Sequence, residues 1–272
     1  MSKNKLKKFA EMEDIPFVFQ YPFAVLSEKD FPHRGKWHSE VFGNDRPITL
    51  ELGCGKGEYA TGLARRHPEG NYIGVDIKGA RMHTGATAAL REGLGNVAFL
   101  RTSIELIDRF FTPGEVAEIW ITFPDPQMKK TSKRLTSTRF LDLYRRILGD
   151  GGVINLKTDS PFLFTYTKLL AEANPGAITV EAISDNLYKD YRPGEEGKAC
   201  HDLPLDLDIR THYEQQWLDR GLTIKYIRMR LDASTPLVEP EVEIEHDTYR
   251  SYSRGQVQCP ELCAPAVRFK KQ

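Results

Sequence analysis

The chain has 272 residues, in which 38 Lys and Arg residues balance 38 Asp and Glu residues, and 40% of its residues are hydrophobic. This composition is typical of a folded globular protein and excludes a mainly disordered one. Its apolar runs are only a few residues long, which excludes a membrane-spanning helix of ~18 to 20 residues. Residues 1–8 are basic but lack the apolar core of a secretory signal. We therefore expect a cytoplasmic protein without a membrane partner.

Apolar runs bounded by Gly, Pro and Asn alternate with helix-compatible stretches along the chain. This alternation predicts parallel strands joined by helices, and hence an α/β fold with a doubly wound, Rossmann-like sheet of seven strands. The expected strands are 48–53, 71–77, 96–102, 118–123, 152–158, 178–183 and 222–231. The expected helices are 57–66, 79–91, 103–110, 136–148, 161–173 and 211–220.

Three segments fall outside this alternation. Residues 1–45 are expected to form a basic N-terminal arm followed by an irregular segment rich in aromatic residues and proline. Residues 185–210 are expected to be an insertion near the edge of the sheet. Residues 232–272 form a tail to which the sequence assigns no role. The predicted division of the chain is therefore 1–45, 46–231 with its insertion, and 232–272.

The neutral net charge is an average over two oppositely charged segments. Residues 127–146 contain seven Lys or Arg residues and one acid, whereas residues 232–247 contain six acids and no Lys or Arg. A cationic strip on a neutral protein is typical of a localised phosphate contact, and a solvated helix face is the alternative interpretation.

The four cysteines are too few and too scattered for a disulfide framework in a chain of this length. Cys259 and Cys263 flank three residues, and Cys200 precedes His201, but neither pair has the matching partner pair that a zinc site requires. We expect reduced thiols and no metal site.

The first predicted strand ends in a loop with three glycines at alternating positions, Gly53, Gly55 and Gly57. Glycine permits a positive φ and has no Cβ, so a ligand can lie against the loop backbone where the chain enters a helix. A dinucleotide fingerprint would have its third glycine at position 58, which is Glu58, so nicotinamide and flavin cofactors are disfavoured. A structural turn without a ligand is the alternative.

Two acids lie beside this loop in the predicted fold. Asp76 ends the second strand, where a carboxylate can accept both hydroxyls of a ribose. Glu51 at the foot of the loop would repel a pyrophosphate and suits a cationic or zwitterionic ligand. S-adenosylmethionine has an amino group, a sulfonium and no phosphate. The loop and Asp76 resemble the class of Rossmann-like methyltransferases that use this cofactor, and the resemblance implies that strand 222–231 runs antiparallel to its neighbour.

A rigid turn follows the fourth predicted strand, in the sequence Phe123-Pro-Asp-Pro126. Ligands in open parallel sheets bind beyond the carboxyl ends of the strands, so Asp125 is expected at the opening of the cofactor crevice. The two prolines restrict the backbone and hold the carboxylate in place. Taken alone, the turn is equally well explained as a purely structural feature.

This region resembles the bacterial single-chain tRNA (guanine-N7-)-methyltransferase family. The matching residues of the turn and its basic strip are Phe123, Pro124, Asp125, Pro126, Lys129, Lys130, Lys133 and Arg134. Gln127 and Met128 stand where the family usually has Trp and Pro. Two later segments also match, Leu156-Lys-Thr-Asp159 and Arg210-Thr-His-Tyr-Glu-Gln215 followed by Gly221.

The resemblance implies transfer of the methyl group of S-adenosylmethionine to N7 of a guanine in the tRNA variable loop, by a methyltransferase domain at residues 46–231. It implies one catalytic residue, Asp125. The implied cofactor-binding residues are Glu51, Gly53, Gly55, Gly57, Asp76, Thr102 and Asp125. The implied substrate-binding residues are Lys129, Asp159, Thr211 and Glu214. The sequence is compatible with a monomer or a homodimer.

The chemistry of this reaction agrees with the residue types. N7 of guanine has an in-plane lone pair and no proton, so its methylation needs alignment and charge stabilisation but no general base. Two alternative functions remain open. One is a methyltransferase that acts on another RNA or a small substrate, and the other is an RNA-binding protein without catalytic activity.

Overall fold

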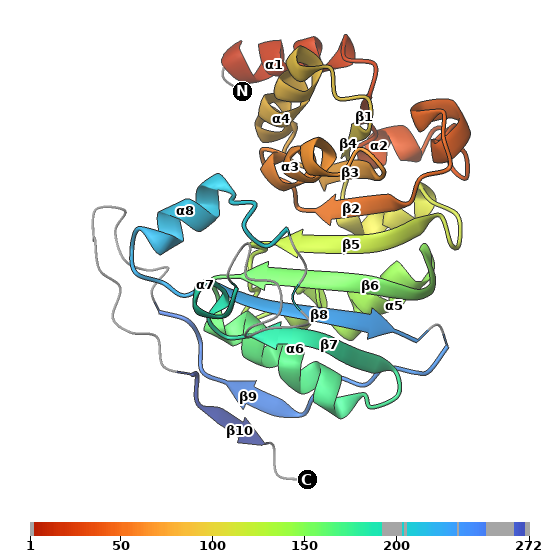
Figure 1. Ribbon diagram of the computed structural model, residues 1–272. Helices are drawn as coiled ribbons and strands as arrows, with labels where there is room; N and C mark the ends of the chain where they lie inside the picture. The colour runs from red at the N-terminus through yellow and green to blue at the C-terminus, as the bar shows by residue number, and fades with distance from the viewer. Residues whose placement is uncertain (1–2, 192–202, 204–205, 233, 249–263, 270–272) are drawn as a thin grey trace. The chain divides into compact units, whose positions relative to one another are not determined.

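The computed structural model describes residues 3–191, 203, 206–232, 234–248 and 264–269 (Figure 1). The chain divides into two compact units. The first unit consists of Met1–Thr122 and Leu143–Gly152, and the second of Phe123–Asp142 and Val153–Gln272.

The first unit contains five parallel strands in the order β1-β4-β3-β2-β5. These are β1 (Val18–Gln20), β2 (Ile48–Leu52), β3 (Asn71–Asp76), β4 (Val97–Arg101) and β5 (Val116–Thr122). Its helices are α1 (Lys3–Glu13), α2 (Phe23–Leu26), the π-helix η1 (Trp37–Phe42), α3 (Glu58–Arg66), α4 (Gly79–Glu92) and the 3-10 helix η2 (Ile104–Arg109). Helix α1 packs against α4, as Figure 1 shows.

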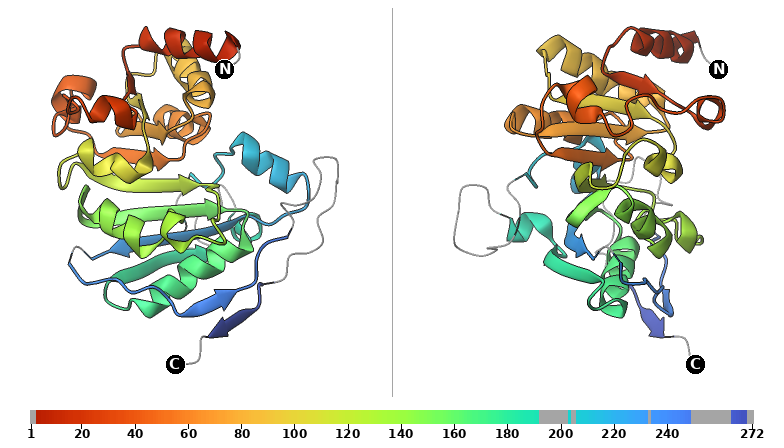
Figure 2. Two further views of the ribbon diagram at one scale, coloured as in Figure 1. Left: turned by 180° about the vertical axis from the view of Figure 1, so that it is seen from behind. Right: turned by 90° about the vertical axis from the view of Figure 1, so that its right-hand side faces the viewer.

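The second unit contains three strands in the order β6-β8-β7, and β8 runs antiparallel to both neighbours. These are β6 (Leu148–Thr158, whose first residues belong to the first unit), β7 (Ile178–Ser184) and β8 (Lys225–Leu231). Its helices are the 3-10 helix η3 (Thr131–Lys133), α5 (Thr138–Arg145, whose last residues belong to the first unit), α6 (Pro161–Ala173), α7 (Leu187–Asp190) and α8 (His212–Leu218). Helix α6 packs on β7 and β8 (Figure 2), and β9 (Val242–Ile244) pairs antiparallel with β10 (Val267–Phe269).

The structure confirms the α/β fold, all seven predicted strands and the antiparallel direction of the last one. The predicted helix 103–110 is present as a 3-10 helix, η2. The expected basic arm and irregular segment of residues 1–45 instead contain four regular elements, α1, β1, α2 and η1. Helix α1 buries Met12 completely and stacks the Phe9 ring on Arg101, and β1 has only three residues, too few to give an alternating pattern.

The core of the first unit combines buried strand residues with a cluster of aromatic rings. Leu50 and Ile73 are fully buried in the sheet. Trp37 is also fully buried, stacks on Phe111 with ring centroids 5.3 Å apart, and donates its indole N–H to the Phe110 carbonyl at 2.9 Å. The segment expected to be irregular therefore supplies much of this core.

No helix in the described part of the chain is long and apolar enough to cross a membrane. Of the predicted insertion, residues 192–202 and 204–205 lie outside the described residues. The same is true of Cys200, Cys259 and Cys263, whereas Cys54 is a buried free thiol.

Candidate functional site

The glycine loop of the first unit is held by Asp76 at the end of β3. The Asp76 carboxylate accepts the N–H of Gly55 at 2.8 Å through Oδ2 and the N–H of Lys78 at 2.7 Å through Oδ1. Gly53 and Gly55 have φ values of 80° and 55°, a left-handed conformation that side chains disfavour. Asp76 therefore fixes the shape of the loop and keeps lone pairs for a ligand.

The three glycines have different surroundings. A Cβ built on Gly53 would meet no atom within 4 Å, and one built on Gly55 would meet only the Gly53 carbonyl, at 4.0 Å. A Cβ on Gly57 would collide with the Phe99 ring at 2.4 Å. Gly53 and Gly55 thus border open space in which a cofactor can lie, whereas Gly57 permits close packing of the loop against β4.

Glu51 is almost fully buried at 2% exposure. Its carboxylate accepts the Ala60 N–H of α3 at 2.9 Å and the Thr122 hydroxyl at 2.8 Å. Burial raises the pKa of Glu51 to about 8, and these two hydrogen bonds only partly oppose the effect. Glu51 is therefore mostly protonated at neutral pH, and a cationic ligand group nearby would favour its ionised form.

Thr102 directly follows β4 and offers an unused hydroxyl. The residue is fully buried, and its Oγ1 has no hydrogen-bond partner among the described residues. Its backbone N–H donates to the Asp76 carbonyl at 3.2 Å, which places the two residues side by side. A buried hydroxyl without a partner is costly, so Thr102 fits a site whose ligand supplies that partner.

Ile77 is a residue near this loop that the sequence interpretation overlooked. It directly follows Asp76 and is 58% exposed, which is unusual for a large aliphatic side chain at the end of a buried strand. An apolar residue immediately after the strand-ending acid was the available signal. Ile77 provides an apolar surface beside the groups that suit a nucleoside.

Asp125 in the second unit is presented by a strained turn. Phe123 and Gln127 flank the Pro-Asp-Pro sequence and have φ values of 50° and 47° without being glycine. Asp125 is exposed, while both neighbouring prolines are buried. Its Oδ1 accepts the Gln127 N–H at 3.0 Å. The turn therefore fixes the carboxylate at the surface, at a cost in backbone strain that functional sites often carry.

The basic strip after this turn is less uniformly exposed than its charge pattern indicates. Lys129 and Lys130 are exposed. Arg134 is only 7% exposed, and its guanidinium stacks on the rings of Phe162 and Tyr166 at 4.8 and 4.3 Å. Arg134 was grouped with the phosphate-binding lysines, but its burial assigns it a structural role.

Asp159 follows β6 directly and is fully buried. The next residue, Ser160, is the N-cap of α6 and accepts the Leu163 N–H at 3.0 Å. Asp159 thus lies at a tightly constrained junction between a strand and a helix. Its role in substrate binding stays a prediction.

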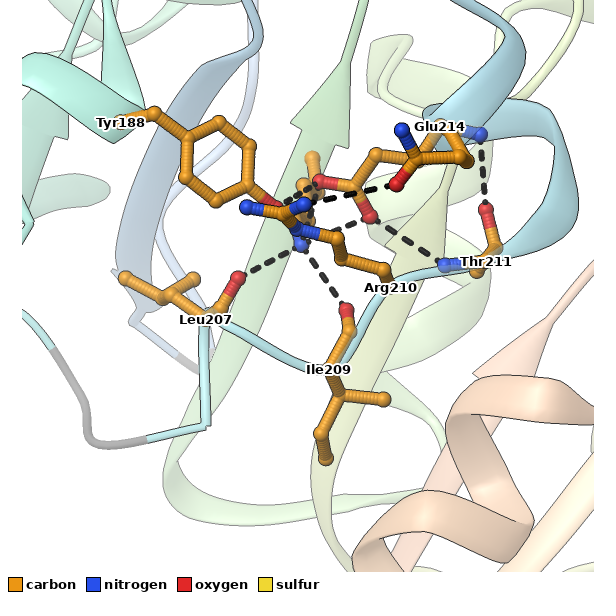
Figure 3. A network of polar contacts seen from close by, with 8 residues as sticks. Tyr188, Leu207, Ile209, Arg210, Thr211 and Glu214 are labelled. Atoms are coloured by element: carbon orange, nitrogen blue, oxygen red, sulfur yellow. Dashed lines mark hydrogen bonds and ion pairs between the residues drawn. The ribbon is translucent and has the colours of Figure 1, made fainter. Parts of the chain in front are cut away.

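Thr211 and Glu214 form a capping box at the start of α8 (Figure 3). The Thr211 hydroxyl accepts the Glu214 N–H at 3.1 Å, and the Glu214 carboxylate accepts the Thr211 N–H at 3.3 Å. Glu214 is fully buried and also accepts the Tyr188 hydroxyl at 2.6 Å. Both residues therefore hold the start of α8 in place, and their contact with substrate stays a prediction.

Lys157 is the centre of this network. It belongs to the sequence motif 156–159, in which only Asp159 was predicted to be a site residue. Its buried ammonium lies 2.8 Å from Glu214 and donates to the carbonyls of Leu207 and Ile209 at 2.7 and 3.1 Å. Burial lowers the pKa of Lys157, and Glu214 opposes this effect. Lys157 lies two residues before Asp159 in β6, and its ammonium joins this strand to the segment that precedes α8.

The structure therefore provides two groups of predicted site residues, one in each unit. In the first unit, the open glycine loop lies beside Asp76 and Thr102. In the second, the exposed Asp125 and Lys129 share one loop, which joins the end of β6 through a hydrogen bond from Phe123 N–H to the Lys157 carbonyl at 2.8 Å. The first group suits a nucleoside with a cationic substituent. The second suits a polyanionic ligand that carries a group on which positive charge develops.

Known proteins similar to this chain are methyltransferases. The sequence profile of a family described as "Putative methyltransferase" matches residues 45–226. The chain is 60% identical to a tRNA (guanine-N(7)-)-methyltransferase of Porphyromonas gingivalis, over 90% of this chain and 97% of that relative. It is 57% identical to a protein of the same name from Bacteroides thetaiotaomicron, over 94% of this chain and 97% of that relative.

Solved structures support the same fold. The 16S rRNA methyltransferase KamB matches with a TM-score of 0.53 and 13% identity, over 71% of this chain and 92% of that chain. This likeness confirms the predicted Rossmann-like methyltransferase fold.

Proposed function

Because this chain belongs to the tRNA (guanine-N7-)-methyltransferase family, we propose that it transfers the methyl group of S-adenosylmethionine to N7 of a guanine in the tRNA variable loop. The membership agrees with the resemblance carried by the sequence motifs. The observation that carries the proposal is the near full-length relation to enzymes of that name. A tRNA substrate also agrees with the cytoplasmic location expected from the sequence.

The first unit supplies the residues that would hold the cofactor. The Asp76 carboxylate would accept the ribose hydroxyls, the Thr102 hydroxyl would bond the adenine, and Ile77 would pack against its face. Glu51 lies next to the loop and balances the amino group, which shifts it toward its ionised form. When bound, S-adenosylmethionine supplies an electrophilic methyl group on its sulfonium. Gly53 and Gly55 leave the space that this ligand needs.

The second unit supplies the residues that would bind the substrate. Asp125 carries a fixed negative charge that stabilises the positive charge on the methylated purine. No residue has to remove a proton, because N7 has none. Lys129 and Lys130 contact phosphates and give tRNA binding that weakens with salt. Thr211 and Glu214, together with Lys157, hold the segment before α8 in place for substrate binding.

The experiment that tests this proposal is methyl transfer from radiolabelled S-adenosylmethionine to an unmodified tRNA transcript, followed by mapping of the modified nucleotide. The proposal expects label at one guanine of the variable loop, and on the order of 100-fold slower transfer by Asp125→Asn. A 16S rRNA fragment serves as the control for the alternative of another RNA substrate. Label in the rRNA and none in the tRNA would replace the proposed substrate.

A further inference from the structure

The acid-rich segment 232–247 had no role in the sequence interpretation, yet two of its carboxylates reach helix N-termini of the second unit. Glu239 accepts the N–H and the hydroxyl of Thr138, the first residue of α5, at 3.0 and 2.8 Å. Its second oxygen accepts the Tyr166 hydroxyl of α6 at 2.6 Å. A carboxylate at this place satisfies free helix N–H groups and interacts favourably with the helix dipole.

Asp247 makes the corresponding contact at the start of α6. Its Oδ1 accepts the Phe162 N–H at 3.0 Å, and its Oδ2 accepts the Ser160 hydroxyl. Ser160 is the residue after Asp159, so Asp247 braces the junction that carries this predicted substrate residue. The Asp247 N–H also lies 3.1 Å from the Met128 sulfur, in the loop that carries Lys129.

Arg134 connects these contacts to the turn of Asp125. The rings of Tyr166 and Phe162 together cover the Arg134 guanidinium. Glu239 anchors the Tyr166 hydroxyl, and Asp247 accepts the backbone N–H of Phe162. Arg134 in turn donates to the carbonyls of Gln127 and Met128 at 3.3 and 3.0 Å. A chain of direct contacts thus runs from the tail to the backbone beside Asp125.

The two carboxylates differ from their neighbours in the tail. Glu241 and Glu243 lie between them in sequence and are exposed, and neither makes a side-chain hydrogen bond within the described residues. A general electrostatic attraction to the basic strip, or a general role in solubility, would not select particular acids. The carboxylates of Asp232 and Glu245 accept hydrogen bonds only from other tail residues within the described part of the chain. Glu239 and Asp247 instead bond to residues of α5 and α6, which indicates a specific structural task.

From this geometry we infer that Glu239 and Asp247 are positioning residues for the substrate-binding residues of the second unit. Their contacts brace α5, α6 and Arg134, and thereby hold the strained turn of Asp125 and the junction of Asp159 in the conformation that receives tRNA. The expected change in the kinetics of tRNA methylation rests on the proposed function. The contacts that carry it are independent of that function.

The test uses the full-length chain with Glu239→Ala, Asp247→Ala and the matched control Glu243→Ala. We expect kcat/KM for tRNA to fall on the order of 10-fold in the first two variants, because displacement of the Asp125 and Lys129 loop misaligns the reacting groups. The KM for tRNA should rise, while the Kd for S-adenosylmethionine stays within about twofold of wild type. Loss of folded protein alone would lower the apparent kcat without raising KM.

Conservative variants provide a rescue. Asp247→Asn keeps an acceptor for Phe162 N–H and places a donor toward the Ser160 hydroxyl, so its KM for tRNA should lie between those of wild type and Asp247→Ala. If Asp247→Ala does not fold, the conservative variants Asp247→Asn and Glu239→Gln are measured instead, with Glu243→Gln as their control. Their KM for tRNA should rise less than that expected for the alanine variants, but should still exceed that of Glu243→Gln. Wild-type KM and kcat/KM in every folded Glu239 and Asp247 variant would overturn the inference.

Hydrogen exchange separates this inference from the proposed function. Amides of residues 127–134 and 160–165 should exchange faster in Glu239→Ala and Asp247→Ala than in Glu243→Ala. If wild-type protein transfers no methyl group to tRNA, the proposed function fails and the exchange rates alone decide the positioning role. Equal exchange in all three variants would overturn it.

Discussion

Glu51 in the first unit and Glu214 in the second are both buried acids that sequence motifs assign to the site, at 2% and 0% exposure. Glu51 accepts hydrogen bonds from two neutral groups, and burial raises its pKa to about 8. Glu214 faces the ammonium of Lys157 at 2.8 Å. The fold thus balances the charge of Glu214 internally, whereas the charge of Glu51 is left for a ligand to balance.

Removal of the internal cation should have the largest effect on stability. Lys157→Met leaves Glu214 as a buried charge without its cation, and removes the donor to two backbone carbonyls. We expect a loss of about 3 to 5 kcal/mol in the free energy of unfolding, measured by urea denaturation at pH 7. The double variant Lys157→Met with Glu214→Gln should recover part of this loss. A loss below about 1 kcal/mol would mean that the ion pair is unimportant for the fold.

Neutralisation of Glu51 should have a smaller effect that depends on pH. The folded pKa of about 8 lies above the ordinary value of 4.5, so the folded state binds more protons between these pH values. The stability of the wild type therefore falls as pH rises through this window. Glu51→Gln removes the dependence, so its stability relative to wild type should increase by roughly 2 to 3 kcal/mol from pH 5 to pH 7.

Urea denaturation of both proteins at a series of pH values measures this difference. The free energies of wild type and Glu51→Gln should diverge steadily across the window. Parallel stability curves would show that Glu51 titrates normally, and would remove the contrast with Glu214.

The exposed Lys129 should have the smallest effect on stability and a specific effect on binding. Lys129→Ala should change the free energy of unfolding by less than about 0.5 kcal/mol. The slope of log K against log salt for tRNA binding should become shallower by about 1, with unchanged affinity for S-adenosylmethionine. Lys168→Ala, at an exposed position of α6, serves as the matched control. An unchanged salt slope would exclude Lys129 from the phosphate contacts.

The elements of the fold were predictable where the chain has a strong local pattern. The buried strands β2 to β5 consist of apolar runs, and Thr211 with Glu214 forms a capping box that is readable from its spacing. The short strand β1 and the lysine-rich helix α1 were missed, because three residues show no period and the lysines resembled a solvated arm.

The partners of the site residues were not predictable in the same way. The bonds from Lys157 to the carbonyls of Leu207 and Ile209 join positions some fifty residues apart, and no local spacing encodes them. Arg134 was counted as surface charge for the same reason, since its covering rings come from α6. Residue types indicated which chemistry was available. Only the tertiary contacts showed which charged groups are already engaged by partners inside the protein.

Replacement of N7 of the target guanine by carbon tests most directly whether this atom accepts the methyl group. Two tRNA transcripts are compared, one with guanosine and one with 7-deazaguanosine at the mapped position of the variable loop. If N7 accepts the methyl group, the first transcript is methylated and the second is not, and both bind with similar affinity. Methyl transfer to the 7-deaza transcript at the same rate would contradict N7 as the acceptor.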